Sequence, residues 1–131
     1  KLYNFSRNKS TSEKKLKKFY PTVLTPAIAS NLSENYYSKI IEALVIQFAK
    51  AKYFWRDQYK DEVDAIELRD KEIIPIEVKY RPNPEVNKGF EKFCKKYWCK
   101  NAFVITKNTV KKLVQNQVTV VYAPVHDYLL C

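Results

Sequence analysis

Two strand-forming runs that follow closely on one another, residues 62–68 and 71–80, constrain the fold of this chain most strongly. Polar and apolar residues alternate in the first run, which is the pattern of a strand with one solvated face. The second run is more apolar, yet Glu77 and Lys79 lie among its isoleucine and valine residues. Because an isolated charge is costly to bury, such groups must be paired or bind a metal ion.

Helical and strand patterns alternate around these two runs. The predicted elements are a helix over 34–50 with Ser33 as its N-cap, a strand over 52–57, the two runs themselves, a helix over 87–98, a strand over 101–106, a short helix over 108–115, a strand over 117–124 and a last amphipathic turn over 125–130. The central order of helix, strand, strand, strand, helix and strand predicts an α/β fold, with a mixed sheet and helices packed on its faces. Upstream, the sequence predicts a short strand ending at Tyr20 and a helix start at Thr25-Pro26.

Several of these elements carry a more detailed prediction. Pro75 has no N–H to donate, so we expect an edge position or a bulge there. The unbroken apolar run over 101–106 favours a buried parallel strand. Helical spacing predicts two apolar stripes, one made of Tyr37, Ile40, Ile41, Leu44, Val45 and Phe48 with Glu42 away from its centre, and one made of Phe90, Phe93, Cys94, Tyr97 and Trp98.

Length and composition limit the class of protein. The 131 residues suit one compact domain, which we place at 17–131, with 1–16 as a linker or frayed end. Twenty-four Lys and Arg against 14 Asp and Glu leave a formal charge of +10, which fits a polyanionic partner, nucleic acid before an anionic membrane, and equally fits a lysine-rich surface kept for solubility. No apolar run is long enough for a membrane span, and we expect a cytoplasmic protein that is a fragment of a longer chain. Gly89 is the only glycine, which excludes P-loop and dinucleotide-binding motifs.

Other candidate residues have a structural and a functional interpretation. Cys94 and Cys99, with His126, have a weak zinc-type spacing, but buried free thiols in a reducing compartment are favoured. A structural role is likewise favoured for His126, and a core strand is favoured over base stacking for residues 53–55. Glu62 is either a further group of the metal site or a solvated partner of Lys60.

The charged residues of the two strands form a candidate metal site. Side chains alternate along a strand, so Glu77 and Lys79 point the same way, and Asp64 joins them if the two strands pair. Asp64, Glu77 and the backbone carbonyl of Val78 make an oxygen-rich set that suits Mg²⁺ or Mn²⁺. Lys79 is then available for a phosphate or an attacking water.

The spacing of Asp64, 12 further residues and then Glu77-Val78-Lys79 resembles the PD-(D/E)xK nuclease superfamily. That resemblance implies a restriction-endonuclease-like core of helix, three strands, helix and strand, with an acidic residue on the first helix, for which Glu42 is placed. Val63 stands where the superfamily name has Pro. More narrowly, "KKFYP", "YFWRD", "DEVDAIEL", "IIPIEVKY" and "AFVIT", in this order, resemble the C-terminal nuclease-like domain of prokaryotic, often archaeal, AAA+ ATPases. This resemblance covers about residues 17–128 and implies a P-loop ATPase and a winged helix upstream.

The function implied is Mg²⁺- or Mn²⁺-dependent hydrolysis of nucleic-acid phosphodiesters, with DNA favoured as the substrate. The catalytic residues implied are Glu42, Asp64, Glu77 and Lys79, and Glu42 is a further candidate metal ligand. The candidates for nucleic-acid binding are four lysines of the helix after the motif: Lys88, Lys92, Lys95 and Lys96. The alternatives are a catalytically inactive DNA-binding module of the ATPase and a protein-interaction domain. The oligomeric state stays open.

Overall fold

The structure is a computed structural model, and it describes residues 1–7, 17–18 and 34–130. Within these residues, one sheet has eight strands in the order β2-β1-β3-β4-β5-β6-β8-β7. The strands are β1 (Leu2–Asn4), β2 (Lys17–Lys18), β3 (Tyr53–Arg56), β4 (Glu62–Arg69), β5 (Glu72–Lys79), β6 (Asn101–Thr106), β7 (Lys111–Gln115) and β8 (Val118–Pro124). The helices are α3 (Glu34–Phe48), α4 (Lys88–Lys96) and α5 (Val125–Leu130).

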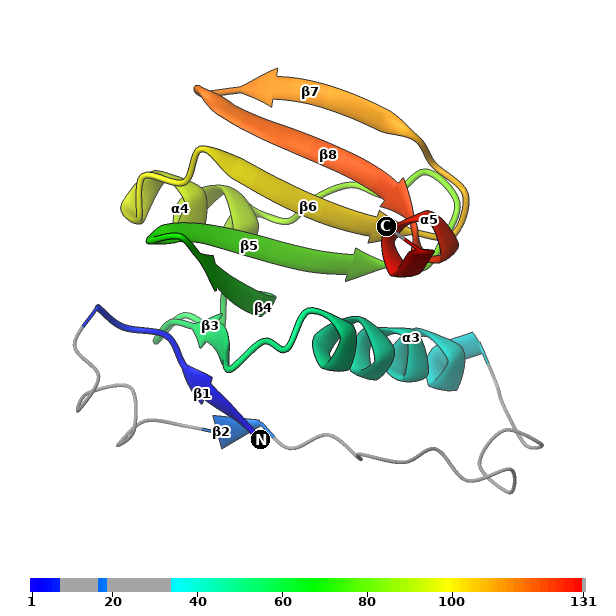
Figure 1. Cartoon of the computed structure of the whole chain (residues 1–131). Helices are drawn as coiled ribbons and strands as arrows, with labels where there is room; N and C mark the ends of the chain where they lie inside the picture. The colour runs from blue at the N-terminus through cyan, green and yellow to red at the C-terminus, as the bar shows by residue number, and fades with distance from the viewer. Residues whose placement is uncertain (8–16, 19–33, 131) are drawn as a thin grey trace.

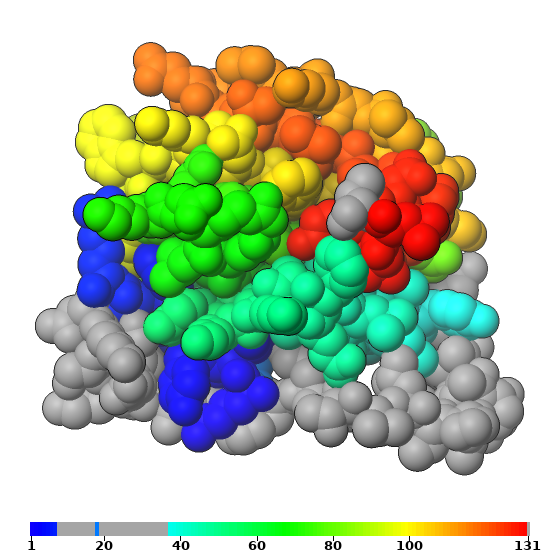
Figure 2. Space-filling model, viewed as in Figure 1, coloured from blue at the N-terminus to red at the C-terminus, as the bar shows by residue number. Residues whose placement is uncertain are grey.

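Helices cover both faces of the sheet (Figure 1). On one face, α4 buries Phe90 and Phe93 against sheet residues that include Val63 and Ile66. On the other face, α3 packs against the sheet together with α5, and these two helices lie side by side in the surface view (Figure 2). The molecule is therefore a mixed α/β fold with one apolar core on each side of the sheet.

The predicted order of elements is confirmed from α3 to β6, which run helix, strand, strand, strand, helix, strand. β3, β4 and β5 form an antiparallel meander, and β6 then pairs with β5 in parallel. The prediction that residues 101–106 form a buried parallel strand is also confirmed, because β6 lies between β5 and β8 and is parallel to both.

The helix predicted over 108–115 is wrong. Residues Lys111–Gln115 form strand β7, which pairs antiparallel with β8. The turn between the two strands consists of Asn116 and Gln117, which both have positive φ angles, 50° and 67°. A two-residue turn of this kind matches the twist of a hairpin. It pairs β7 with β8, although the segment 108–115 has helical spacing in the sequence.

The prediction for Pro75 is also wrong, because β5 is a central strand between β4 and β6. Pro75 pairs with Ile66 of β4, and the register there is regular. Pairing with β6 begins only at Ile76, one residue later. Proline is tolerated at this position because the ladder on the β6 side has not yet started.

The two helical stripes are only partly as predicted. The buried face of α3 is made of Glu42, Ala43, Val45 and Ile46, whereas Tyr37 and Phe48 are 48% and 45% exposed. Glu42 therefore lies on the buried face of α3 and not beside that face. The reason is that α3 packs against β5 through this face. After α4, Trp98 is 83% exposed with a φ of 56°, because the helix ends at Lys96 and the backbone turns away.

The start of the chain differs from the predicted linker. β1 pairs with β2 and β3, and Leu2 and Phe5 are buried in the two cores. Residues 8–16, Tyr20, Thr25-Pro26, Ser33 and Cys131 lie outside the described residues. In the part that is described, no helix is long and apolar enough to cross a membrane.

Candidate functional site

A change of register in β4 positions Asp64. Tyr53 of β3 pairs with Ile66, but Trp55 pairs with Val63, so β4 has one residue more than β3 between these two pairs. Such a bulge bends a strand and redirects its side chains. On the other side of β4, the regular register with β5 ends at Ala65, which follows Asp64 and pairs with Ile76. The two strands therefore separate at Asp64.

Asp64 uses this separation to reach the neighbouring strand. Its Oδ2 accepts a hydrogen bond from the backbone N–H of Val78 at 2.8 Å, where a ladder bond would otherwise lie. Asp64 keeps some solvent contact, but surrounding protein desolvates the carboxylate and raises its pKa from 3.8 to about 7. The negative charges of Glu77 and Glu42 contribute to this raised pKa, after burial.

Glu77 is the most deeply buried ionisable side chain of the described residues, at 2% exposed. Its Oε1 pairs with Lys79 Nζ at 2.8 Å and accepts a hydrogen bond from Asn87 Nδ2 at 3.1 Å. Asn87 is also the N-cap of α4, so this bond ties the helix to the site. Burial raises the pKa of Glu77, although Lys79 opposes the rise.

The second oxygen of Glu77, Oε2, is buried and has no hydrogen-bond partner within the described residues. A buried carboxylate oxygen without a partner is costly, and it requires a proton, a water or a cation. The predicted proximity of Glu77 and Lys79 is thus confirmed, and the arrangement leaves one oxygen with binding capacity.

Glu42 reaches the same carboxylates from α3 and is 8% exposed. Its negative charge contributes to raising the pKa of both Asp64 and Glu77, so the three groups interact electrostatically. Glu42 Oε2 lies 3.8 Å from Lys39 Nζ, one turn earlier on the helix. The structure therefore places Asp64, Glu77 and Lys79 together on neighbouring strands, and Glu42 of α3 within electrostatic range of the two carboxylates.

Lys18 of β2 is a further member that the sequence analysis missed. Its ammonium group pairs with Glu62 and lies near the ring of Phe54. Burial lowers the pKa of Lys18, while the charges of Asp64, Glu42 and Glu77 counteract this. No sequence signal marks Lys18 among its neighbouring lysines, because only the chain path across the sheet brings it to the site. Glu62 pairs with Lys18 and, at 3.7 Å, with Arg56, and within the described residues it forms no ion pair with the predicted partner Lys60.

The residues present fit a hard divalent cation in part. No three His, Cys, Asp or Glu side chains within residues 1–7, 17–18 and 34–130 are grouped so that they would hold a metal ion. Asp64 and Glu77 nevertheless supply two carboxylates, and Glu77 Oε2 is without a partner in the described part. Mg²⁺ commonly binds through one or two carboxylates and keeps several waters, so a third side chain is not required.

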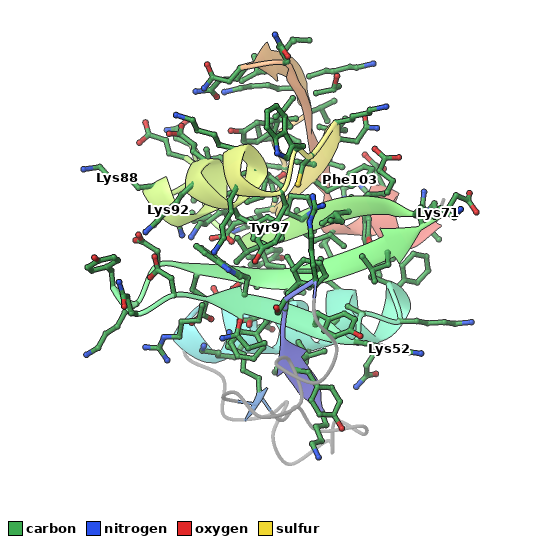
Figure 3. The ribbon with its side chains drawn as sticks, turned by 90° about the vertical axis from the view of Figure 1, so that its left-hand side faces the viewer. Lys52, Lys71, Lys88, Lys92, Tyr97 and Phe103 are labelled. Atoms are coloured by element: carbon green, nitrogen blue, oxygen red, sulfur yellow. The ribbon has the colours of Figure 1, made fainter. Side chains whose placement is uncertain are left out.

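A basic hollow lies around the turn that joins β3 to β4, and none of Glu42, Asp64, Glu77 and Lys79 is among its lining residues. It has a volume of about 760 Å³, and its lining includes Arg56, Lys60, Lys92 and Lys96, with Trp55 and Tyr59 among its aromatic residues. Figure 3 shows Lys88 and Lys92 extending from α4 on the side of this turn. Lys92 is paired with Asp57 and Asp61 of the turn.

All four lysines predicted to bind nucleic acid are exposed on α4. Lys92 and Lys96 line the hollow, whereas Lys88 and Lys95 are not among its lining residues. Lys96 Nζ lies 5.9 Å from the Trp55 ring centroid, within the range of a cation–π contact.

The remaining candidates are two cysteines, His126 and the aromatic residues of β3. Cys94 and Cys99 are free and buried, as favoured by the sequence. His126 is exposed on α5 and lies 3.3 Å from Asp127, and no metal-binding group includes it in the described part of the chain. Phe54 and Trp55 are buried, so β3 is an aromatic core strand.

Comparisons with known proteins give one family. A family model described as "Domain of unknown function (DUF4143)" matches residues 30–126. This family is often found at the C-terminus of AAA-type ATPases. No curated protein and no solved structure matches the chain.

Proposed function

The chain belongs to the DUF4143 family, and from the geometry of its site we propose that it is a metal-dependent phosphodiesterase of the PD-(D/E)xK nuclease type. The observation that carries the proposal is the buried Glu77, which is paired with Lys79 through one oxygen and has a buried second oxygen without a partner in the described residues. Asp64 lies beside it, where β4 and β5 separate. Asp64 and Glu77 would together hold a divalent cation, which would neutralise both carboxylates.

The arrangement of elements supports this proposal. The order α3-β3-β4-β5-α4-β6, with a meander followed by a parallel strand, is the order of a restriction-endonuclease-like core. Asp64 and Glu77 come from the second and third strands in this order of elements, and Glu42 comes from its first helix. The sheet strands outside this order, β1, β2, β7 and β8, extend the sheet at its two edges.

Each residue of the site has its own proposed role in hydrolysis. Asp64, Glu77 and the carbonyl of Val78 would hold Mg²⁺ or Mn²⁺, which when bound polarises the phosphate and makes a coordinated water more acidic. The water oxygen forms a bond to phosphorus, the bond to the leaving oxygen breaks, and a proton passes to that oxygen. Lys79 stabilises the negative charge that develops on the phosphate. Glu42 would support the bound ion through a water or as a further carboxylate ligand.

The basic hollow supplies the binding surface for the substrate. Its lysine and arginine side chains suit the phosphodiester backbone and do not require base recognition. Within the longer protein, we propose that an upstream AAA+ ATPase brings this site to DNA, since the family is often found after such ATPases.

One observation favours a second function, which is a catalytically inactive DNA-binding module. No three metal-binding side chains are grouped in the described residues, and Lys79 is tied to Glu77. In such a module the Glu77–Lys79 pair would be structural, and the hollow alone would bind DNA.

Cleavage assays separate the two functions. Labelled duplex, branched and single-stranded DNA and RNA are incubated with the protein and Mg²⁺, Mn²⁺, Ca²⁺ or EDTA. We expect cleavage with Mg²⁺ or Mn²⁺ and little with Ca²⁺, whose looser coordination positions water poorly. Asp64→Asn, Glu77→Gln and Lys79→Met should each reduce the rate by about 100-fold or more.

Lys112→Met is the matched control, because Lys112 is exposed on β7 and pairs in register with Val121, away from the site. It should cleave like the wild type, and all variants must be purified identically to exclude a contaminating nuclease. Equal rates for the wild type and Lys79→Met would refute the enzymatic proposal. No cleavage by the wild type, with DNA binding retained, would favour the binding module.

A further inference from the structure

Lys18 brings a second ammonium group to the carboxylates of the site. It precedes Glu62 by 44 positions in the chain, yet its Nζ is paired with Glu62 Oε1, and its side chain is 22% exposed. The charges of Asp64, Glu42 and Glu77 attract the same ammonium group. Lys79 has a similar exposure, 21%, and pairs with Glu77. Two lysines from different strands therefore lie among the acidic groups.

Protein cations already contact most of the carboxylates that a second metal ion would use. Glu62 Oε1 pairs with Lys18, and Glu62 Oε2 lies 3.7 Å from Arg56 Nε. Glu42 Oε2 lies 3.8 Å from Lys39 Nζ. In contrast, Glu77 Oε2 is the buried side-chain oxygen that has no partner within the described residues. These ion pairs indicate one position for a metal ion, at Glu77 and Asp64. The position beside it is taken by the ammonium group of a lysine.

The summed formal charge of this group of acidic and basic side chains also indicates a single divalent ion. Its four carboxylates, at positions 42, 62, 64 and 77, and its two less exposed ammonium groups, at 18 and 79, leave a formal charge of −2. One divalent cation neutralises this charge. Arg56 and Lys39 are more exposed, at 36% and 77%, so solvent screens their charges more strongly.

We propose that the site binds a single divalent ion, at Asp64 and Glu77, and that Lys18 occupies the place of the second ion of two-metal nucleases, about 4 Å from the first. This inference rests on the proposed metal-dependent function and assigns Lys18 a role within it. Held by Glu62, the ammonium group binds a non-bridging oxygen of the substrate phosphate as a compact point charge. Lys18 thereby completes the cation pair that flanks the phosphate.

Mn²⁺ binding to the whole chain tests the inference without substrate. Isothermal titration gives the stoichiometry, and electron paramagnetic resonance distinguishes an isolated Mn²⁺ from a coupled pair. We expect one ion in the wild type and two in Lys18→Met, because removing the ammonium group frees Glu62 and leaves room for a second ion. The double variant Lys18→Met/Glu62→Gln should return to one ion. Lys39→Met is the matched control: it removes a charge beside Glu42 but leaves Lys18 in place, so it should bind one ion.

The outcomes separate this inference from the proposed function. A wild type that binds no Mn²⁺ overturns both. Two ions in the wild type, or one ion in folded Lys18→Met, overturn the role of Lys18 and leave the metal-dependent function standing. If circular dichroism shows that Lys18→Met does not fold, Glu62→Gln provides the test. It should bind one ion with an affinity within about twofold of the wild type, and a tenfold loss would make Glu62 a ligand and refute the inference.

Discussion

At the scale of single residues, the site is defined by carboxylates that are buried without a full set of partners, which is rare in proteins. Glu77 is 2% exposed and has a buried oxygen without a partner in the described part of the chain. Asp64 carries a pKa of about 7 because burial and two neighbouring carboxylates disfavour its charge. Perturbed carboxylates of this kind are concentrated at functional sites, since a purely structural role is served better by apolar residues.

The raised pKa of Asp64 predicts how stability depends on pH in the absence of metal. The folded state holds the proton of Asp64 more tightly than the unfolded state, so the contribution of Asp64 to stability is fully present below about pH 4 and is lost as pH rises to about 7. Asp64→Asn keeps an acceptor for the Val78 N–H but has no charge to bury. It should therefore be more stable than the wild type at pH 8, by up to about 4 kcal/mol, since one pKa unit corresponds to about 1.4 kcal/mol.

Urea denaturation with EDTA, at intervals from pH 4 to pH 8, measures this difference. The two free energies of unfolding should converge near pH 4 and diverge toward pH 8. Parallel profiles over the whole range would show that Asp64 is not desolvated as the structure indicates.

At the scale of elements, the site depends on how closely α4 approaches β4. Gly89 lies in the first turn of α4, and a Cβ atom there would lie 2.8 Å from the backbone nitrogen of Glu62. It would also lie 3.1 Å from Asn87 Oδ1 and 3.1 Å from Asp61 Cβ. The only glycine of the chain thus lets the helix start directly against β4, next to the N-cap that donates to Glu77.

Gly89→Ala should destabilise the protein by about 2 kcal/mol, because the added methyl group meets backbone that cannot move without shifting α4 or β4. On helix propensity alone, the same change in a helix interior would stabilise by up to about 1 kcal/mol. Urea denaturation of the wild type, Gly89→Ala and the exposed neighbour variant Lys88→Ala decides between these effects. Lys88→Ala should lie within about 0.5 kcal/mol of the wild type. If Gly89→Ala leaves the stability unchanged or raises it, the close approach of α4 to β4 is contradicted.

At the scale of the whole molecule, the formal charge of +10 is distributed unevenly. Four cationic side chains line the hollow at the turn between β3 and β4, while the carboxylates of the site lie at the separation of β4 and β5. Because Arg56 of the hollow lies 3.7 Å from Glu62, we expect a polyanion bound in the hollow to extend toward the acidic site. A divalent cation in that site would reduce its repulsion of phosphate.

Binding to duplex DNA should depend steeply on salt and weakly on sequence. If the four cations of the hollow each contact a phosphate, affinity falls by roughly 100-fold between 50 and 200 mM salt. Lys60→Gln/Lys96→Gln should lower the salt slope by about two, and Lys111→Gln/Lys112→Gln on the edge strand β7 is the charge-matched control. Fluorescence anisotropy with Ca²⁺ present measures all three proteins. Equal slopes for the two double variants would place the DNA elsewhere on the surface.

Patterns of residues within each segment predicted much of this protein. Alternation in 62–68 and 71–80 predicted β4 and β5, and the order of elements from α3 to β6 followed from local periodicity. The same alternation placed Glu77 beside Lys79, which the 2.8 Å ion pair confirms. These features depend on nearest neighbours along the chain, so the sequence alone determined them.

Tertiary structure decided the features that depend on pairing between distant segments. Lys111–Gln115 became a strand because the Asn116–Gln117 turn pairs it with β8, and Pro75 lies in a central strand because β6 starts to pair one residue later. The bulge that turns Asp64 toward Val78 appears only in the register of β4 against β3, and Lys18 reaches Glu62 only because β1 and β2 extend the same sheet. The physical reason is that a strand acquires its partners, and a charge its neighbours, from the whole sheet, whereas periodicity reports only which face of an element is apolar.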